Sequence, residues 1–557
     1  MTDVVILALN SNYVHSALAP RYLKAAIGDL PLLCEIAEHT VNESVYAVAE
    51  DIAKRAPRLL AVSVYIWNIQ TVYKLATLIK EKLPNVILVL GGPEVSYNAV
   101  DVLKHAPEID CVICGEGEIP FRLLCDRLIS GNISPISGIA YRRDGRIVAA
   151  EPFVGSGTPV SPYTDEYLAT LKDRIAYFES SRGCPYACAY CLSGRCDGLR
   201  FFDDGYVYKN LIRLATSGAK VIKFVDRTFN ADRKRAYRLF SYLIHEYGKT
   251  FPSDVCFHFE LSGDLLDDET IALLCSAPRG LFQFEIGIQS FHPETIRAIR
   301  RATNSSVLKQ RISQLTACGR AHIHVDLIAG LPYEDFAHFR DSFNQAYALG
   351  ADMLQLGFLK ILHGTELEAR ASAYGLCYTD APPYEVTETP WLSAPEIGRL
   401  KTAERAVDRL HNSGRFRRTL ALCIPFWTSP FDFFLAVGQC FAKSEGLDAL
   451  TNRLFDFLCR ALPEQAEEIR DALVCDRLAT NSSRGLPHAL YRPDSNLGVI
   501  RARLNRAAET AEHPGVRRNI AVLYNTDRAV FADYSADRFD GREYILSFIS
   551  LSGGELL

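Results

Sequence analysis

Long hydrophobic runs, a large excess of charge of one sign and low-complexity segments are all absent from this sequence of 557 residues. No stretch of about 18 or more uncharged apolar residues occurs, so we expect no membrane-spanning helix and no membrane partner. The formal net charge of −5 is small for this length and gives no reason to expect nucleic acid as a partner. No basic residue precedes the first apolar run, MTDVVILALN, so this start predicts a β-strand rather than a signal peptide.

The sequence contains sixteen cysteines but no export signal, which predicts reduced thiols and a cytoplasmic protein. Most of them, such as Cys275 and Cys459, lie in apolar helical patterns and are expected to be small core residues. Three others, Cys184, Cys188 and Cys191, are closely spaced and call for a different explanation.

Residues 1–150 predict an α/β domain built on a doubly wound parallel sheet. Runs rich in Val, Ile and Leu alternate with amphipathic helical patterns, which is typical of a parallel sheet covered on both faces. A hairpin turning at Asp144 and Gly145 follows, and the Pro and Gly residues of 153–165 predict a linker. The predicted strands are Val4–Leu9, Leu33–Ala37, Leu59–Ile66, Val86–Leu90 and Ile109–Cys114.

Residues 165–384 predict a second α/β domain, a partial (βα)6 barrel of the TIM type. In such a barrel the functional residues follow the carboxyl ends of the strands. Residues 385–557 predict a mainly helical accessory domain with a strand-like end, and they carry no motif with evident chemistry. The barrel strands are expected at Ala176–Ser180, Val221–Val225, Val255–Glu260, Phe282–Ile288, His322–Ile328 and Met353–Leu359.

Three cysteines follow the first barrel strand in the segment RGCPYACAYC. Their spacing places three thiolates in one loop, and three thiolates can ligate three irons of a [4Fe–4S] cube while the fourth iron stays open. The alternatives are a zinc knuckle, for which Cys196 offers an irregularly spaced fourth ligand, and unrelated buried thiols.

The CxxxCxxC triplet, with Tyr190 before its last cysteine, resembles the radical S-adenosylmethionine (radical SAM) superfamily. The resemblance implies that Cys184, Cys188 and Cys191 bind a [4Fe–4S] cluster whose open iron chelates SAM. It also implies an external one-electron donor of the flavodoxin or ferredoxin type, and cleavage of SAM to a 5′-deoxyadenosyl radical.

The ends of the later barrel strands resemble other segments of this superfamily. Asp226 lies in an FxDxxFN-like segment, Gln289 and Ser290 lie in a GxQS-like segment, and Glu260 and Gly330 end the third and fifth strands. Together with Arg301 on the helix that follows the fourth strand, these residues are candidates for binding SAM. A helix cap or a solvated loop side chain is the alternative for each of them.

The N-terminal domain resembles the cobalamin-binding domain fused to radical SAM enzymes. Parallel α/β sheets bind ligands beyond the carboxyl ends of their strands, and the resemblance places Ser63, Gly91, Gly92, Gly115 and Glu116 in that pocket. The Asp-x-His-x-x-Gly motif that supplies a cobalt-ligating histidine is missing, because Asn10, Asn12 and His15 stand there instead. His15 is therefore expected to cap a helix or lie exposed, and a scaffold that binds nothing remains an alternative for the domain. The C-terminal third also resembles an uncharacterised domain that accompanies such enzymes.

These resemblances predict an enzyme that transfers a methyl group, by way of cobalamin, to an unactivated carbon of an unknown small-molecule or peptide substrate. A radical cyclase or rearrangement enzyme without methylation is the first alternative, and a non-catalytic cobalamin-binding sensor is the second. No catalytic residue can be named. Arg415, Arg417 and Arg418 are candidates for an anionic substrate, although a solvated helix end is the preferred interpretation.

Overall fold

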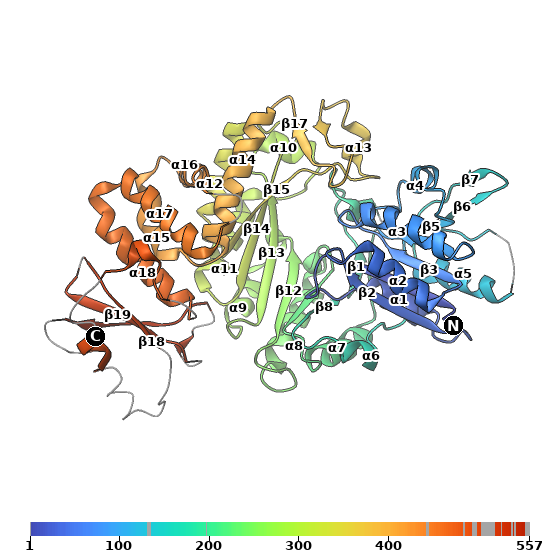
Figure 1. Cartoon of the computed structure of the whole chain (residues 1–557), viewed down its shortest axis with the longest axis horizontal. Coiled ribbons are helices and arrows are strands. Elements are labelled where there is room, and N and C mark those ends of the chain that lie inside the picture. Colours follow the sequence, from blue (N-terminus) through green and yellow to red (C-terminus); the bar gives the residue numbers. More distant parts are fainter. Residues whose placement is uncertain are drawn as a thin grey trace. The chain divides into compact units, whose positions relative to one another are not determined.

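The structure is a computed structural model that describes residues 2–130, 135–195, 198–441, 445–482, 485–492, 498–502, 518–524, 526–535, 538–539 and 542–551 (Figure 1). The chain forms two compact units. The first unit consists of Met1–Ile323, Gly330–Asp335 and Phe358–Ser393, and the second of His324–Ala329, Phe336–Gly357 and Ala394–Leu557. The domain boundaries expected near residues 150, 165 and 384 stay predictions.

The first unit begins with a seven-stranded sheet in the order β2-β1-β3-β4-β5-β6-β7. The pairs from β2 to β5 are parallel, with Leu7 opposite both Ala37 and Val62, and β6 and β7 add an antiparallel edge. The predicted parallel sheet is thus confirmed. Its strands are β1 (Val4–Asn10), β2 (Cys34–Thr40), β3 (Leu59–Ser63), β4 (Ile87–Gly91), β5 (Cys111–Ile113), β6 (Ile139–Arg143) and β7 (Arg146–Val148).

Helices cover both faces of this sheet, as a doubly wound fold requires. Alternate residues of β1 point to opposite faces, so Val5 packs with α2, α3 and α4 while Val4 packs with α1 and α5. These helices are α1 (Ala19–Ala26), α2 (Val45–Arg55), α3 (Ile69–Lys82), α4 (Ala99–His105) and α5 (Glu118–Ser130).

The hairpin and the segment after it show how the chain leaves this sheet. Asp144 and Gly145 both have positive φ (49° and 74°), the geometry of a two-residue type I′ turn, which confirms the predicted turn. The predicted linker, in contrast, starts as part of the sheet. The Phe153 N–H donates to the Cys114 carbonyl (2.8 Å), and the Phe153 carbonyl accepts from the Glu116 N–H (2.9 Å).

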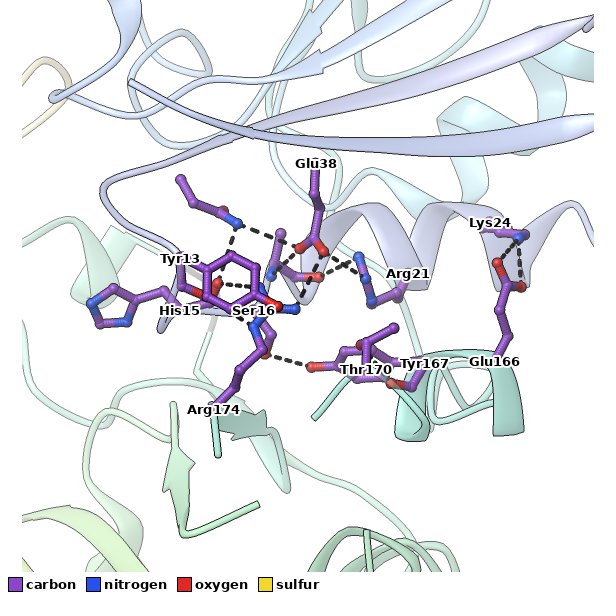
Figure 2. A network of polar contacts seen from close by, with 12 residues as sticks. Tyr13, His15, Ser16, Arg21, Lys24, Glu38, Glu166, Tyr167, Thr170 and Arg174 are labelled. Atoms are coloured by element: carbon purple, nitrogen blue, oxygen red, sulfur yellow. Dashed lines mark hydrogen bonds and ion pairs between the residues drawn. The ribbon is translucent and has the colours of Figure 1, made fainter. Parts of the chain in front are cut away.

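A polar network ties the loop after β1 to the segment that leads into the second sheet (Figure 2). Arg174 donates to the carbonyl oxygens of Tyr13 (3.0 Å) and His15 (2.7 Å), and Arg21 donates to Glu38 (3.0 Å). The Ser16 hydroxyl donates to the carbonyl of Ile175, the first residue of β8. These bonds fix the start of the second sheet against the first domain.

The second sheet has six strands in the order β15-β14-β13-β12-β11-β8, which is the order of the chain. The pairs β8–β11, β11–β12 and β12–β13 are parallel. All six predicted strands are present, and the predicted curvature into a partial barrel stays a prediction. The strands are β8 (Ile175–Phe178), β11 (Val221–Phe224), β12 (Cys256–Leu261), β13 (Phe282–Gln289), β14 (His322–Ala329) and β15 (Met353–Phe358).

One face of this sheet is aromatic and the other is polar. In β13 the residues Phe282, Phe284, Ile286 and Ile288 are buried, while those between them are only half-buried. The rings of Phe224 and Phe259 lie 4.3 Å apart on the aromatic face. The helices around the sheet are α6 (Asp165–Leu168), α7 (Asp204–Ala215), α8 (Arg233–Glu246), α9 (Asp268–Cys275), α10 (Pro293–Ala298), α11 (Ser305–Cys318), α12 (Phe336–Tyr347) and α13 (Glu366–Arg370). The side chains on the polar face are therefore the ones available to bind a ligand.

Two short antiparallel pairs accompany the sheet and were not predicted. One consists of β9 (Ser181–Gly183) and β10 (Leu199–Phe201), and the other of β16 (Cys377–Tyr378) and β17 (Val386–Glu388). The first pair frames the three cysteines.

The C-terminal part of the second unit is helical and ends in strands, as predicted, and these strands form an antiparallel sheet. Its elements are α14 (Ala394–Ala406), α15 (Arg417–Cys423), α16 (Pro430–Gly438), α17 (Leu447–Ala461), α18 (Ala466–Thr480), β18 (Arg518–Val522), β19 (Arg528–Asp533) and β20 (Leu546–Ser550). Among the described residues no single helix is long and apolar enough to cross a membrane. One sharply bent pair, Arg417–Phe426 with Pro430–Gly438, meets the criteria of length and composition at an angle of 108°.

Candidate functional site

The three cysteines lie in one loop between β9 and β10, and all three are half-buried. Gly183 precedes the loop with a φ of +89°, and a side chain there would overlap the carbonyl oxygen of Gly198. The middle of the loop is anchored through Ala189, whose N–H donates to Ile299 (2.9 Å) and whose carbonyl accepts from the Leu367 N–H (2.9 Å). The loop therefore has a fixed backbone path around its thiols.

Arg301 supplies positive charge beside these thiols. Burial raises the pKa of Cys188, and the Arg301 guanidinium opposes that rise by favouring the thiolate. Arg301 also donates to the hydroxyl of Tyr190 (3.3 Å), and the Cys184 sulfur lies 3.4 Å from the hydroxyl oxygen of Thr228. Thiolates are the form that binds iron, so the charge of Arg301 favours the ligating form of Cys188 against the effect of burial.

Within the described parts of the chain, no three His, Cys, Asp or Glu side chains converge as ligands of a single metal ion would. The thiols of a cubane cluster each bind a different iron, so convergence on one point is not expected of them. Cys196, the fourth ligand of the zinc alternative, lies outside the described residues.

Gln289 and Arg301 each present an unpaired buried polar atom near the cysteine loop. Gln289 ends β13 with a φ of +69°, and its Oε1 has no hydrogen-bond donor, while Arg301 Nε has no acceptor. Between them lies Gly287, where a side chain would overlap Gln289 Nε2 and lie 3.3 Å from Arg301 Nη2. Buried polar atoms are rarely left unpaired, so an acceptor and a donor here fit a polar ligand such as SAM.

The other residues assigned to SAM are placed differently. Glu260 keeps 23% of its side chain exposed, and its Oε1 lies 3.6 Å from Arg227 Nη1. Ser290 donates to Glu334 and accepts from the His292 N–H (2.9 Å), the pattern of a local cap. Gly330 has a φ of +88° at the end of β14 and leaves room for Val386.

Asp226 is almost fully buried (1% exposed) in a network of its own. It accepts hydrogen bonds from the Ser180 N–H (2.9 Å), the Ser180 hydroxyl (2.7 Å) and the Ser181 hydroxyl (2.5 Å). Both carboxylate oxygens are thus used to hold the turn that leads into β9. A contact of Asp226 with the ammonium of SAM stays a prediction.

The N-terminal candidates lie at the carboxyl ends of β3, β4 and β5. Ser63 and Gly91 are paired across these strands. A side chain on Gly92 would overlap the Val64 carbonyl, and one on Gly115 would overlap the Phe153 carbonyl. Local packing therefore already requires glycine at both positions. Glu116 is bound by two arginines, Arg182 and Arg200.

Two aromatic residues at the same edge were not assigned to the site by sequence. The rings of Tyr65 and Trp67 are stacked with centroids 4.4 Å apart, and Trp67 is 52% exposed. His15 is half-buried, and its Nδ1 is hydrogen-bonded with the hydroxyl of Tyr177 at 2.6 Å. The expectation that His15 caps a helix or lies exposed is therefore wrong.

The arginines expected at a solvated helix end are partly paired. Arg418 donates to Glu543 (2.8 Å) and Arg417 lies 3.7 Å from Asp352. Both arginine side chains thus lie close to carboxylates of the second unit and neutralise part of their charge.

Three family models match the chain in the order of these features. The model "B12 binding domain" matches residues 4–124, "Radical SAM superfamily" matches residues 178–346, and "Protein of unknown function (DUF4080)" matches residues 372–512. The second match contains the cysteine loop. The matched segment 178–346 is a radical SAM domain. This domain implies a [4Fe–4S] cluster and SAM, and the first match implies cobalamin. The third match agrees with the predicted accessory domain.

Curated relatives match about half of this chain. "Cobalamin-dependent radical SAM methyltransferase TokK" of Streptomyces tokunonensis is 29% identical over 53% of this chain and 45% of its own length. "2-(S-pantetheinyl)-carbapenam-3-carboxylate methyltransferase" of Streptantibioticus cattleyicolor is 27% identical over the same shares. "Anaerobic magnesium-protoporphyrin IX monomethyl ester cyclase" of a Synechocystis species is 26% identical over 48% of this chain and 54% of its own length. The chain thus spans about half the length of these relatives.

Two solved structures share the fold. The radical SAM methyltransferase TsrM of Kitasatospora setae, with cobalamin and a [4Fe–4S] cluster bound, has a TM-score of 0.56 at 19% identity over 69% of this chain and 76% of TsrM. The cobalamin-dependent radical SAM enzyme OxsB has a TM-score of 0.59 at 14% identity over 92% of this chain and 80% of OxsB. At these identities the likeness is one of fold.

Proposed function

We propose that this protein transfers a methyl group to an unactivated carbon of a small-molecule or peptide substrate. The observation that carries the proposal is the loop of Cys184, Cys188 and Cys191 beside the unpaired polar atoms of Gln289 and Arg301. When bound, the cluster, SAM and cobalamin supply the radical step and the methyl group, and the protein supplies binding and orientation. The relatives named as methyltransferases support this reaction class.

In this proposal the chain's own residues divide the work. Cys184, Cys188 and Cys191 bind the cluster, and the charge of Arg301 favours the Cys188 thiolate against the opposing effect of burial. Gln289, Arg301 and Glu260 bind SAM at the carboxyl ends of the strands, and we propose that the second sheet curves into a partial barrel around them. Ser63, Gly91, Gly92 and Gly115 line the approach of cobalamin, and an external flavodoxin- or ferredoxin-type donor supplies the electron.

A second candidate is a radical ring closure or rearrangement without methylation. The match to the magnesium-protoporphyrin IX monomethyl ester cyclase favours it. The products separate the two reactions, because methylation yields S-adenosylhomocysteine together with 5′-deoxyadenosine, whereas the alternative yields 5′-deoxyadenosine alone.

The proposal is tested on anaerobically reconstituted protein with iron, sulfide, cobalamin and SAM turnover measured together. We expect the substitution Cys188→Ala to abolish 5′-deoxyadenosine formation and to leave cobalamin bound. Cys275→Ala is the matched control, since Cys275 is a half-buried thiol on α9, away from the loop. Undiminished 5′-deoxyadenosine formation by the Cys188 variant would overturn the assignment of the cluster.

A further inference from the structure

Five charged side chains form a compact cluster beside the cysteine loop, here named the glutamate–arginine cluster. Its members are Glu116, Glu118, Glu179, Arg182 and Arg200. All are largely buried, with side-chain exposures of 19%, 16%, 15%, 16% and 22% in that order. Glu116 lies in the loop after β5 and Glu118 is the first residue of α5, both in the N-terminal domain, and both arginines come from the strands that frame the cysteines.

Glu116 bridges the two arginines. Arg182 Nη1 donates to Glu116 Oε2 (2.7 Å), and Arg200 Nη2 donates to both carboxylate oxygens of Glu116 (3.0 and 2.8 Å). Arg182 also donates to Glu118 (2.5 Å) and to Glu179 (3.0 Å). Both oxygens of Glu116 are therefore used within the protein.

The positions of the two arginines in the β9–β10 pair explain what this bridge by Glu116 does. Arg182 in β9 lies directly opposite Arg200 in β10, and like charges at opposed positions of antiparallel strands repel. Cys184 follows Arg182 by two residues, and the described loop between the strands carries all three cysteines. The carboxylate of Glu116 neutralises the repulsion and holds the two ends of the cysteine loop together.

The energetic balance supports a positioning role rather than a contribution to global stability. Removing five charged groups from water costs free energy that ion pairing roughly returns, so a buried ionic cluster is weak evidence for stability. Its bidentate and forked hydrogen bonds, however, fix direction as well as distance. We propose that Glu116, assigned from sequence to the cobalamin pocket, is instead a positioning residue for the cysteine loop. This inference rests on the proposed cluster at Cys184, Cys188 and Cys191.

The test compares Glu116→Gln with a matched variant, Glu38→Gln, in the full chain. Glu38 has almost the same side-chain exposure (20%) and also accepts from an arginine, Arg21 (3.0 Å), but it belongs to the other polar network between the two sheets (Figure 2). Each variant is reconstituted anaerobically and loaded with hydroxocobalamin. The measurements are iron and sulfide per chain, the EPR spectrum and midpoint potential of the reduced cluster, and the dissociation constant of cobalamin.

We expect Glu116→Gln to change the EPR spectrum and the midpoint potential, and to lower the cluster content by about threefold or more. The loss of a charge-assisted hydrogen bond is worth about tenfold in an equilibrium, which sets this scale. The dissociation constant of cobalamin should stay within about twofold of the wild-type value, and Glu38→Gln should leave the cluster unchanged. The double substitution Glu116→Gln with Arg200→Gln removes one of the facing charges, so it should bring the cluster spectrum back toward wild type.

Three results would overturn the inference while the proposed function stands. The first is a cluster spectrum unchanged in Glu116→Gln together with cobalamin binding weakened about tenfold or more. The second is an equal effect of Glu116→Gln and Glu38→Gln, and the third is a double variant no closer to wild type than the single one. Absence of a cluster from the wild-type protein would instead overturn the proposed function itself, and this inference with it.

Discussion

At the scale of single residues, Gln289 combines backbone strain with an unpaired side-chain oxygen. A left-handed backbone costs a non-glycine residue about 1–2 kcal/mol, and such residues persist where the surrounding structure holds them for a purpose. Gly287 allows this arrangement, because its missing side chain leaves space for the Gln289 amide.

The substitution Gly287→Ala tests that arrangement. Its methyl group would overlap Gln289 Nε2, so the amide must move away from the position that we assign to SAM. We expect about tenfold weaker binding of SAM, measured by titration of the reduced cluster followed by EPR, with little change in the unfolding midpoint. Gly398→Ala is the control, since no neighbouring atom lies near that position on α14, and it should be neutral or slightly stabilising. Unchanged binding of SAM by the Gly287 variant would contradict the role of Gln289.

Sequence alone predicted the residues whose signal is local and missed those whose partners are distant. The cysteines are recognisable because their spacing is contained in one short segment. The role of Glu116 depends on arginines that lie 66 and 84 residues further along the chain. Asp226 is likewise held by serines 45 and 46 residues before it, so no pattern around Asp226 could predict its partners.

At the scale of elements, the polar face of the second sheet contains a cationic and an anionic group in contact. Glu285 in β13 accepts from Lys223 in β11 (3.1 Å), and the same oxygen lies 3.1 Å from His258 Nε2 in β12. The interaction with His258, followed by the charge of Lys223, lowers the pKa of Glu285 to about 2. Side chains from three neighbouring strands, β11, β12 and β13, thus meet at the carboxylate of Glu285.

This lowered pKa predicts acid sensitivity. Because the folded pKa lies below the ordinary value, the interaction stabilises the fold fully above about pH 4.5, and the stabilisation is lost as the pH falls toward about 2. The difference corresponds to roughly 3 kcal/mol. We expect the free energy of unfolding of the wild type to fall between pH 5 and pH 3 more steeply than that of Glu285→Gln, as measured by urea titration. Equal slopes would show that Glu285 is not part of the acid response.

The elements themselves were predictable in proportion to their length. The six strands of the second sheet were predicted from segments of five to seven residues, and β13 shows full alternation. The pair β9 and β10 was missed because three residues are too few to show a period. These short strands nevertheless frame the cysteine loop. The sequence therefore located the three cysteines but did not predict the two strands that hold their loop.

At the scale of the whole molecule, the chain forms two compact units, and a buried carboxylate is central to the second. Asp476 on α18 is 1% exposed and accepts from the N–H groups of Arg418 (3.0 Å) and Thr419 (2.9 Å). Arg418 also pairs with Glu543, which joins the last described segment to the helices.

We expect Asp476→Asn to lower the stability of the second unit by about 3 kcal/mol, because it leaves buried donors with a weaker acceptor and removes one of the two carboxylates that pair with Arg418. Calorimetry should show the effect on one thermal transition, while the dissociation constant of cobalamin, assigned to the first unit, stays unchanged. The control is Glu467→Gln, an exposed residue on the same helix. Loss of cobalamin binding in the Asp476 variant would contradict the separation of the two roles.

The pairing of Phe153 with the edge of the first sheet bears on how the cobalamin domain can be isolated. A recombinant fragment that ends at residue 150 would lack Phe153, whose backbone pairs with Cys114 and Glu116 as a strand would. The Cys114 carbonyl and the Glu116 N–H would then have lost their hydrogen-bond partner after the carboxyl end of β5. Such a truncation removes support from the loop that holds Gly115. Excised versions of this domain should therefore run past Phe153, and their solubility should rise abruptly once that residue is included.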